Sequence, residues 1–141
     1  MPRSILYIAA SAIFWVFACT IIFAQTQENQ SAQPQVITIS AKKYEFNPSE
    51  IHVHQGAKVQ LKVHSEDETH GAKLNIYPEG SSGKGTPGLL FSDPGANGKV
   101  AKGVDQVLDF VPQQTGTYEF KCAKVCGFGH NRMKGKLVVD P

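Results

Sequence analysis

The sequence lacks a strong excess of charge of either sign. Its 14 Lys and Arg residues and 12 Asp and Glu residues give a formal net charge of +2 at pH 7. Phosphate binding needs a concentrated basic surface, so this balance argues against a nucleic-acid partner. At 141 residues the chain is also too short for a large multidomain enzyme, and it has no visible internal repeat.

Beyond Ala24 the sequence has no segment of ten or more residues with helical periodicity. Apolar and polar residues alternate instead, as in the run of Val59, Leu61 and Val63, which predicts a half-buried antiparallel strand. Similar alternation occurs around residues 51–53, 108–110, 118–120 and 137–139, with turn-forming residues between the runs. This pattern predicts an all-β fold, a β-sandwich with Greek-key connections.

The N-terminal part contains the one long apolar run. Residues 5–24 are twenty uncharged residues, which as a helix would span about 30 Å. Three interpretations stay open: a cleaved signal peptide over residues 1–24, a single membrane anchor, or a lipoprotein signal ending at Cys19. All three predict export, to the periplasm or to the outer face of the cytoplasmic membrane.

The rest of the chain divides into a tether and one domain. Residues 25–35 are rich in Gln and contain no large apolar side chain, so a flexible tether is expected there. Residues 36–141 form the predicted β-domain. Within it, the Gly-rich segment 81–102 is expected to be a long loop, attached to the domain by its one apolar cluster at residues 89–91.

Four metal-binding side chains lie close together near the C-terminus. Cys122, Cys126, His130 and Met133 fall within twelve residues, and glycines at 127 and 129 would let their loop fold tightly. Zinc does not take methionine as a ligand, whereas thiolate, imidazole and thioether together favour copper. A single-copper blue site uses one cysteine. Two thiolates can bridge two copper ions, but this arrangement requires a second histidine.

His70 is the best candidate for that second histidine, because it lies in the turn after the strand at residues 59–63. His52, His54 and His64 fall on the polar faces of predicted strands, where solvated histidines are expected. A disulfide between the cysteines is an alternative, since exported proteins retain disulfides. It would close a very small loop, stabilise little and leave the histidine and methionine unexplained.

These motifs resemble a known family. The sequence Cys-x3-Cys-Gly-x-Gly-His-x2-Met, followed by residues 134–139, is similar to the dinuclear copper A (CuA) domain of cytochrome c oxidase subunit II. Segments 46–51, 55–59 and 67–71 are similar to cupredoxin domains of this type. The resemblance implies a cupredoxin fold over residues 36–141 and electron transfer from a soluble donor such as cytochrome c.

The resemblance also implies a ligand set for two copper ions. Cys122 and Cys126 would bridge both ions, and His70 and His130 would bind one each. Met133 and the backbone carbonyl of Lys124 would be weak axial ligands. The 52 positions between His70 and Cys122 exceed the separation expected for an oxidase subunit. A stand-alone carrier and a terminal-oxidase subunit therefore both stay open, and no independent catalysis is expected.

Two other functions compete with this interpretation: a copper chaperone or buffer, and a mononuclear cupredoxin in which His70 is not a ligand. One local feature bears on the partner. Five basic residues and no acidic residue lie within positions 121–136: Lys121, Lys124, Arg132, Lys134 and Lys136. They form either a solvated polar face or a basic rim that would attract an acidic partner and repel a basic cytochrome.

Overall fold

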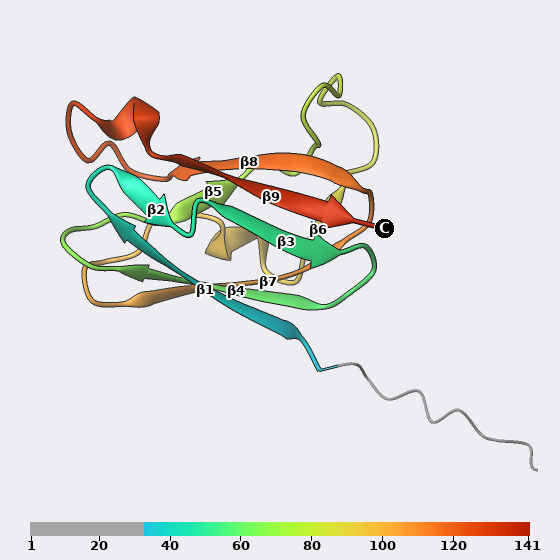
Figure 1. The fold of residues 1–141 in the computed structure, drawn as a ribbon, viewed down its shortest axis with the longest axis horizontal. Coiled ribbons are helices and arrows are strands. Elements are labelled where there is room, and N and C mark those ends of the chain that lie inside the picture. Colours follow the sequence, from blue (N-terminus) through green and yellow to red (C-terminus); the bar gives the residue numbers. More distant parts are fainter. Residues whose placement is uncertain (1–32) are drawn as a thin grey trace, which may run out of the picture.

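The computed structural model describes residues 33–141, which form a sandwich of two β-sheets (Figure 1). The strand order is β2-β1-β4-β7-β6 in one sheet and β3-β9-β8-β5 in the other. The all-β prediction is confirmed for these residues, whose helical elements are two short 3₁₀ helices, η1 (Pro94–Ala96) and η2 (His130–Arg132). None of their helices is long and apolar enough to cross a membrane. The predicted signal or anchor segment, 1–24, lies outside the described residues.

The five-stranded sheet is built around the strand that the alternation of Val59, Leu61 and Val63 predicts. That strand, β4, buries every second side chain, pairs antiparallel with β7 and pairs parallel with β1. The predicted antiparallel pairing therefore holds on one side of the strand only. The strands of this sheet are β1 (Gln35–Lys42), β2 (Glu45–Asn47), β4 (Val59–Ser65), β6 (Leu89–Phe91) and β7 (Asp105–Pro112).

The four-stranded sheet contains three of the other predicted strands. β8 and β9 pair antiparallel, β3 lies parallel to β9 at one edge, and the short β5 pairs with the end of β8. Its strands are β3 (Glu50–His54), β5 (Ala72–Leu74), β8 (Gly116–Cys122) and β9 (Lys134–Asp140). The side chain of Cys122 points inward like those of Tyr118 and Phe120, as its parity along the strand predicts.

Apolar side chains of both sheets meet in one core. Leu61 and Leu108 from one sheet and Phe120 and Leu137 from the other are fully buried. Burying a side chain of this size stabilises the fold by about 1.5–3 kcal/mol before the entropy of ordering is counted. Because β8 and β9 are anchored in this core, the loop that connects them starts and ends at fixed positions.

The Gly-rich segment 81–102 is tied to both sheets. As predicted, residues 89–91 attach it to the domain: they form β6 at the edge of the five-stranded sheet, with Leu89 buried in the core. The segment then crosses to β5, where the Asn97 side chain accepts a hydrogen bond from Leu74 N–H (2.8 Å) and donates one to Leu74 C=O (3.0 Å). The Asn97 side chain thus takes the place of a neighbouring strand.

A buried glutamine holds the same segment from inside. The Gln106 side chain on β7 donates hydrogen bonds to the carbonyls of Ala96 (2.6 Å) and Gly98 (2.9 Å) and bonds Ala72 on β5 through both its N and O atoms. The segment ends beside the residues predicted as metal ligands, where Val100 and His70 exchange two backbone hydrogen bonds of 3.1 Å. Residues 96–100 of this segment, called the strap below, therefore hold His70 in place.

Candidate metal centre

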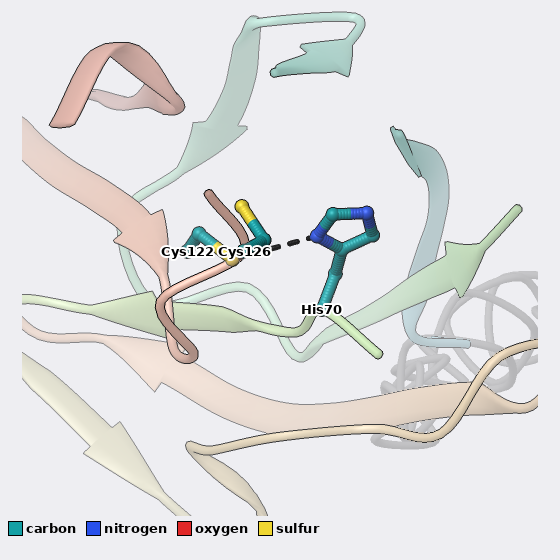
Figure 2. Close-up of side chains that lie close together, drawn as sticks. All are labelled: His70, Cys122 and Cys126. Atoms are coloured by element: carbon teal, nitrogen blue, oxygen red, sulfur yellow. Dashed lines mark hydrogen bonds between the residues drawn. The ribbon is translucent and has the colours of Figure 1, made fainter. Parts of the chain in front are cut away.

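The residues that the sequence nominates as ligands meet at one end of the sandwich. His70 follows β4, Cys122 is the last residue of β8, and Cys126 lies in the loop between β8 and β9 (Figure 2). One ligand atom from each of these three residues lies within 4.8 Å of the other two. Segments 52 positions apart in the sequence are thus brought to one point.

Each thiol has its own imidazole and its own weak donor. Cys122 Sγ lies 3.6 Å from His70 Nδ1 and 3.1 Å from the Lys124 carbonyl oxygen. Cys126 Sγ lies 3.9 Å from His130 Nδ1 and 3.8 Å from Met133 Sδ. The six predicted donors therefore divide into two similar sets of three, one around each sulfur atom.

Four of the five side chains predicted as ligands are buried. His70 and Met133 are 0% exposed, and Cys122 and Cys126 are 4% and 6% exposed. His130, the first residue of η2, is partly exposed. The two cysteines are free thiols, so the disulfide alternative is not the arrangement found.

Burial raises the pKa of the Cys122 thiol to about 11. The neighbouring Cys126 adds to this rise in the pKa. Cys122 therefore keeps its proton at neutral pH when no metal competes for the sulfur atom. A metal ion that binds there must displace this proton, because metals take cysteine as the thiolate.

Asp67 orients the His70 ring from the side opposite the cysteines. Its Oδ1 lies 2.6 Å from His70 Nε2, which leaves Nδ1 facing the cysteines. Burial opposes ionisation of Asp67, but hydrogen bonds from Lys43 N–H and from His70 lower its pKa below the ordinary value. A carboxylate on the outer nitrogen fixes the ring and makes the inner nitrogen a stronger ligand. Sequence reasoning missed Asp67, although its position three residues before His70 was a usable signal.

Tyr44 packs against residues 123–133, the loop between β8 and β9, which we call the ligand loop. A Cβ atom at Gly127 would lie 2.7 Å from the Tyr44 hydroxyl, and one at Gly129 would lie 2.2 Å from the ring. Gly127 has a φ of +126°, as a tight turn would require. Gly129 has an ordinary φ of −88°, so it is required there for space and not for backbone freedom. Gly129 thus permits the predicted tight loop by leaving room for the Tyr44 ring.

The remaining histidines lie away from the centre, as predicted. His52 and His54 are on the outer face of β3, and His52 Nδ1 lies 3.0 Å from Asp140 Oδ2. His64 is on β4, with Nδ1 2.7 Å from Asp105 Oδ1. Carboxylates next to His52 raise its pKa, with Asp140 contributing most.

The donor set fits copper. Two thiols, two imidazoles and a thioether are soft or borderline ligands, and methionine argues against a zinc site. Carbonyl oxygen and thioether are weak donors of the kind found in axial positions. The contacts of Asp67 with His70 and of Tyr44 with the loop at Gly127 and Gly129 would hold these donors in place.

The comparisons with known proteins agree with the fold. The model of the family described as cupredoxin-like domain matches residues 11–139. The chain belongs to this family. This cupredoxin-like chain is 28% identical over 115 residues to cytochrome c oxidase subunit 2 of Thermus thermophilus. The aligned part covers 82% of this chain and 70% of that relative, and 56% of a second Thermus thermophilus subunit 2 that is also 28% identical.

Solved cupredoxin-like structures share the fold at lower identity. Auracyanin from Roseiflexus castenholzii superposes with a TM-score of 0.55 at 21% identity, covering 76% of this chain and 98% of that one. Auracyanin A from Chloroflexus aurantiacus gives 0.54 at 20% identity, covering 77% and 100%. A chain of a heme-copper terminal oxidase dimer gives 0.53 at 22% identity, covering 75% and 65%. The cupredoxin-like fold implies copper binding and electron transfer.

Replacing Asp67 with asparagine is expected to weaken copper binding about 10- to 100-fold, the usual cost of losing an outer-shell partner. The amide would keep the size of the side chain but lose the charge that holds His70 Nε2. Competition with a copper chelator measures this change. Glu66→Gln removes a charge from the same turn without touching His70 and should leave affinity unchanged. Equal affinities for the two variants would contradict a role for Asp67 in orienting His70.

Proposed function

We propose that this cupredoxin-like protein is an exported electron-transfer protein with a CuA-like centre of two copper ions. The observation that carries the proposal is the division of the donors into two sets. Each thiol lies within 4 Å of one imidazole nitrogen and one weak donor. A mononuclear site would need only one such set. The similarity to cytochrome c oxidase subunit 2 supports the same assignment.

In this proposal every donor has a role. Cys122 and Cys126 would hold both ions, His70 and His130 would hold one ion each, and Met133 and the Lys124 carbonyl would be further, weaker donors. A bound copper pair supplies one-electron redox chemistry. The chain excludes water from four of these side chains and fixes His70 through Asp67 and Val100. His130, which is partly exposed, is the point of contact with a partner.

The physiological setting belongs to the proposal as well. The chain would work at the periplasm or at the outer face of the cytoplasmic membrane, held to the membrane by its N-terminal segment if that segment is retained. Its partners would be redox proteins, either a cytochrome c or components of a terminal oxidase. Both a stand-alone carrier and an oxidase subunit are compatible with the site, and neither requires independent catalysis.

A copper chaperone or buffer is the weaker alternative. Releasing copper to a partner calls for accessible, mobile ligands, whereas here the two cysteines, His70 and Met133 are buried. Tyr44 and the strap at residues 96–100 further restrict the ligand loop and His70. The site is built to hold its metal, which suits electron transfer.

Copper loading of the full chain in detergent tests the proposed function. We expect two copper ions per chain, and an EPR spectrum in which one unpaired electron is shared by both ions. One copper ion with a mononuclear spectrum would overturn the dinuclear assignment and favour a simpler cupredoxin. Ready loss of Cu(I) to a competing chelator would favour the chaperone or buffer.

A further inference from the structure

Three lysines lie side by side across the four-stranded sheet, at the end that holds the candidate metal centre. Lys73 on β5 is directly opposite Lys121 on β8, and Lys121 is directly opposite Lys134 on β9. All three side chains are exposed. We call these residues the lysine row. Like charges in directly opposed positions destabilise a sheet, so the row carries an energetic cost in the isolated protein.

Little of this positive charge is neutralised within the described residues. Lys134 Nζ forms an ion pair with Glu119 at 3.1 Å. Across residues 33–141, no carboxylate lies within 4.0 Å of the other five basic side chains in this region. These five side chains are Lys73, Lys121, Lys124, Arg132 and Lys136. Lys136 lies directly opposite Glu50 and Glu119 on its two neighbouring strands. The charge that is free to act on a second molecule is therefore that of the other four side chains.

The lysine row borders the partly exposed His130. Lys121 and Lys134 line a depression of about 240 Å³ together with His130 and Asn131. A molecule that fills this depression touches His130 and both lysines at once. Electron transfer by way of His130 would therefore occur within the positive field of the row.

The tip of the ligand loop adds an apolar contact. Phe128 is fully exposed, and Val125 is 74% exposed. This loop forms an outer end of the sandwich, beyond the ends of β8 and β9 (Figure 1). Exposed aromatic residues surrounded by charge are typical of protein interfaces, in which a few apolar anchors supply most of the binding energy.

Two of the three acidic residues in the turn after β4 are engaged by other groups. The turn after β4 carries Glu66, Asp67 and Glu68. Asp67 binds His70 and Lys43 N–H, and Glu68 forms an ion pair with Lys43 at 3.0 Å. The two sides of the centre therefore differ in charge, and the side of His130 is the basic one.

We propose that the lysine row and Phe128 form the docking surface for an acidic redox protein, which places an apolar spot on Phe128 and carboxylates on the lysines. Opposite charges steer such a partner to this face, and like charge keeps a basic cytochrome away. The docking surface itself does not depend on copper. Its use for electron transfer rests on the proposed function.

Binding to the copper-free full chain in detergent tests this surface, with rubredoxin as an acidic probe protein and mitochondrial cytochrome c as a basic one. Amide chemical shifts of the isotope-labelled chain report the contact. At about 10 mM salt, where the screening length is about 30 Å, we expect rubredoxin to shift residues around 73, 121 and 128–134. Cytochrome c should leave them unchanged.

Charge reversal gives the matched comparison. Lys73→Glu combined with Lys121→Glu should weaken rubredoxin binding at least about tenfold, as expected for the loss of steering charge. The fold should tolerate the pair, because both side chains are exposed and remain a like-charge pair. Lys58→Glu, just before the far end of β4, should leave binding unchanged. Phe128→Ser should weaken binding at all salt concentrations.

Different results would refute the docking surface and the copper centre. Absence of rubredoxin binding, shifts at other residues, or equal effects of the Lys58 and Lys73–Lys121 variants would overturn the docking surface. Copper loading of the same protein decides the proposed function separately. Rubredoxin binding in a protein that takes up no copper would uphold the surface and refute the electron-transfer role.

Discussion

Replacing Cys126 with serine is expected to reduce copper binding from two ions to at most one per chain. Its sulfur lies 3.9 Å from His130 Nδ1 and 3.8 Å from Met133 Sδ, so it is the centre of one of the two donor sets. A serine hydroxyl is a hard, weakly acidic ligand that suits copper poorly. Affinity for the remaining ion should fall by more than about 100-fold. Such a loss exceeds that expected when a residue that only orients a ligand, such as Asp67, is replaced.

Metal analysis and EPR of the loaded variant measure this result. The spectrum should change from one electron shared by two ions to that of a single Cu(II), or vanish. Cys19→Ser is the matched control, since it removes the chain's remaining cysteine, which the nominated ligand set does not include. It should keep both ions. A Cys126→Ser protein that folds and still binds two ions would refute the bridging role of this thiol.

Serine at position 126 would also leave a polar group in a buried position. The hydroxyl could bond His130 or a neighbouring carbonyl, and an unpaired one would cost about 1–3 kcal/mol. Thermal unfolding of the copper-free variant separates this effect from metal loss. A small decrease in stability with a large decrease in copper affinity is the expected combination.

The sequence alone predicted the parts of this molecule that depend on local pattern. Alternation along β4 and β8 identified the strands, and the parity of Tyr118 and Phe120 placed Cys122 on the inner face. The close spacing of donors in residues 122–133 identified the candidate centre, because four donors on one short loop are necessarily neighbours. Only the chemistry of the donors was needed to favour copper.

The parts that depend on distant contacts were not predicted. Tyr44 is more than eighty positions from Gly129, and nothing in its local sequence indicates that the two residues pack together. The bonds from Gln106 and Asn97 to β5 likewise depend on how the two sheets are arranged. Composition showed that the segment 81–102 breaks the strand pattern. The strap that it forms over His70 emerges only in three dimensions.

Replacing Gly71 with alanine is expected to have the largest effect on stability of any single methyl addition near His70. Gly71 has a φ of +119°, which an alanine rarely adopts, and its added Cβ would lie 2.2 Å from the carbonyl oxygen of Gly98. The strained φ costs about 1–2 kcal/mol and the clash with a packed strap about 1–3 kcal/mol. Chemical denaturation of the copper-free protein should therefore show a loss of about 2–5 kcal/mol.

Gly56→Ala is the control variant, because it places alanine at a positive φ without a steric clash. Gly56 also has a positive φ, +78°, but its added Cβ would meet nothing within 4 Å. Its loss should be limited to about 1–2 kcal/mol, and copper binding should be unaffected. Gly71→Ala should in addition weaken copper binding, because the strap that must move to admit the methyl group also holds His70 through Val100. Equal losses of stability in the two variants would mean that the strap moves aside at little energetic cost. The rigid support of His70 would then have to come from Asp67 alone.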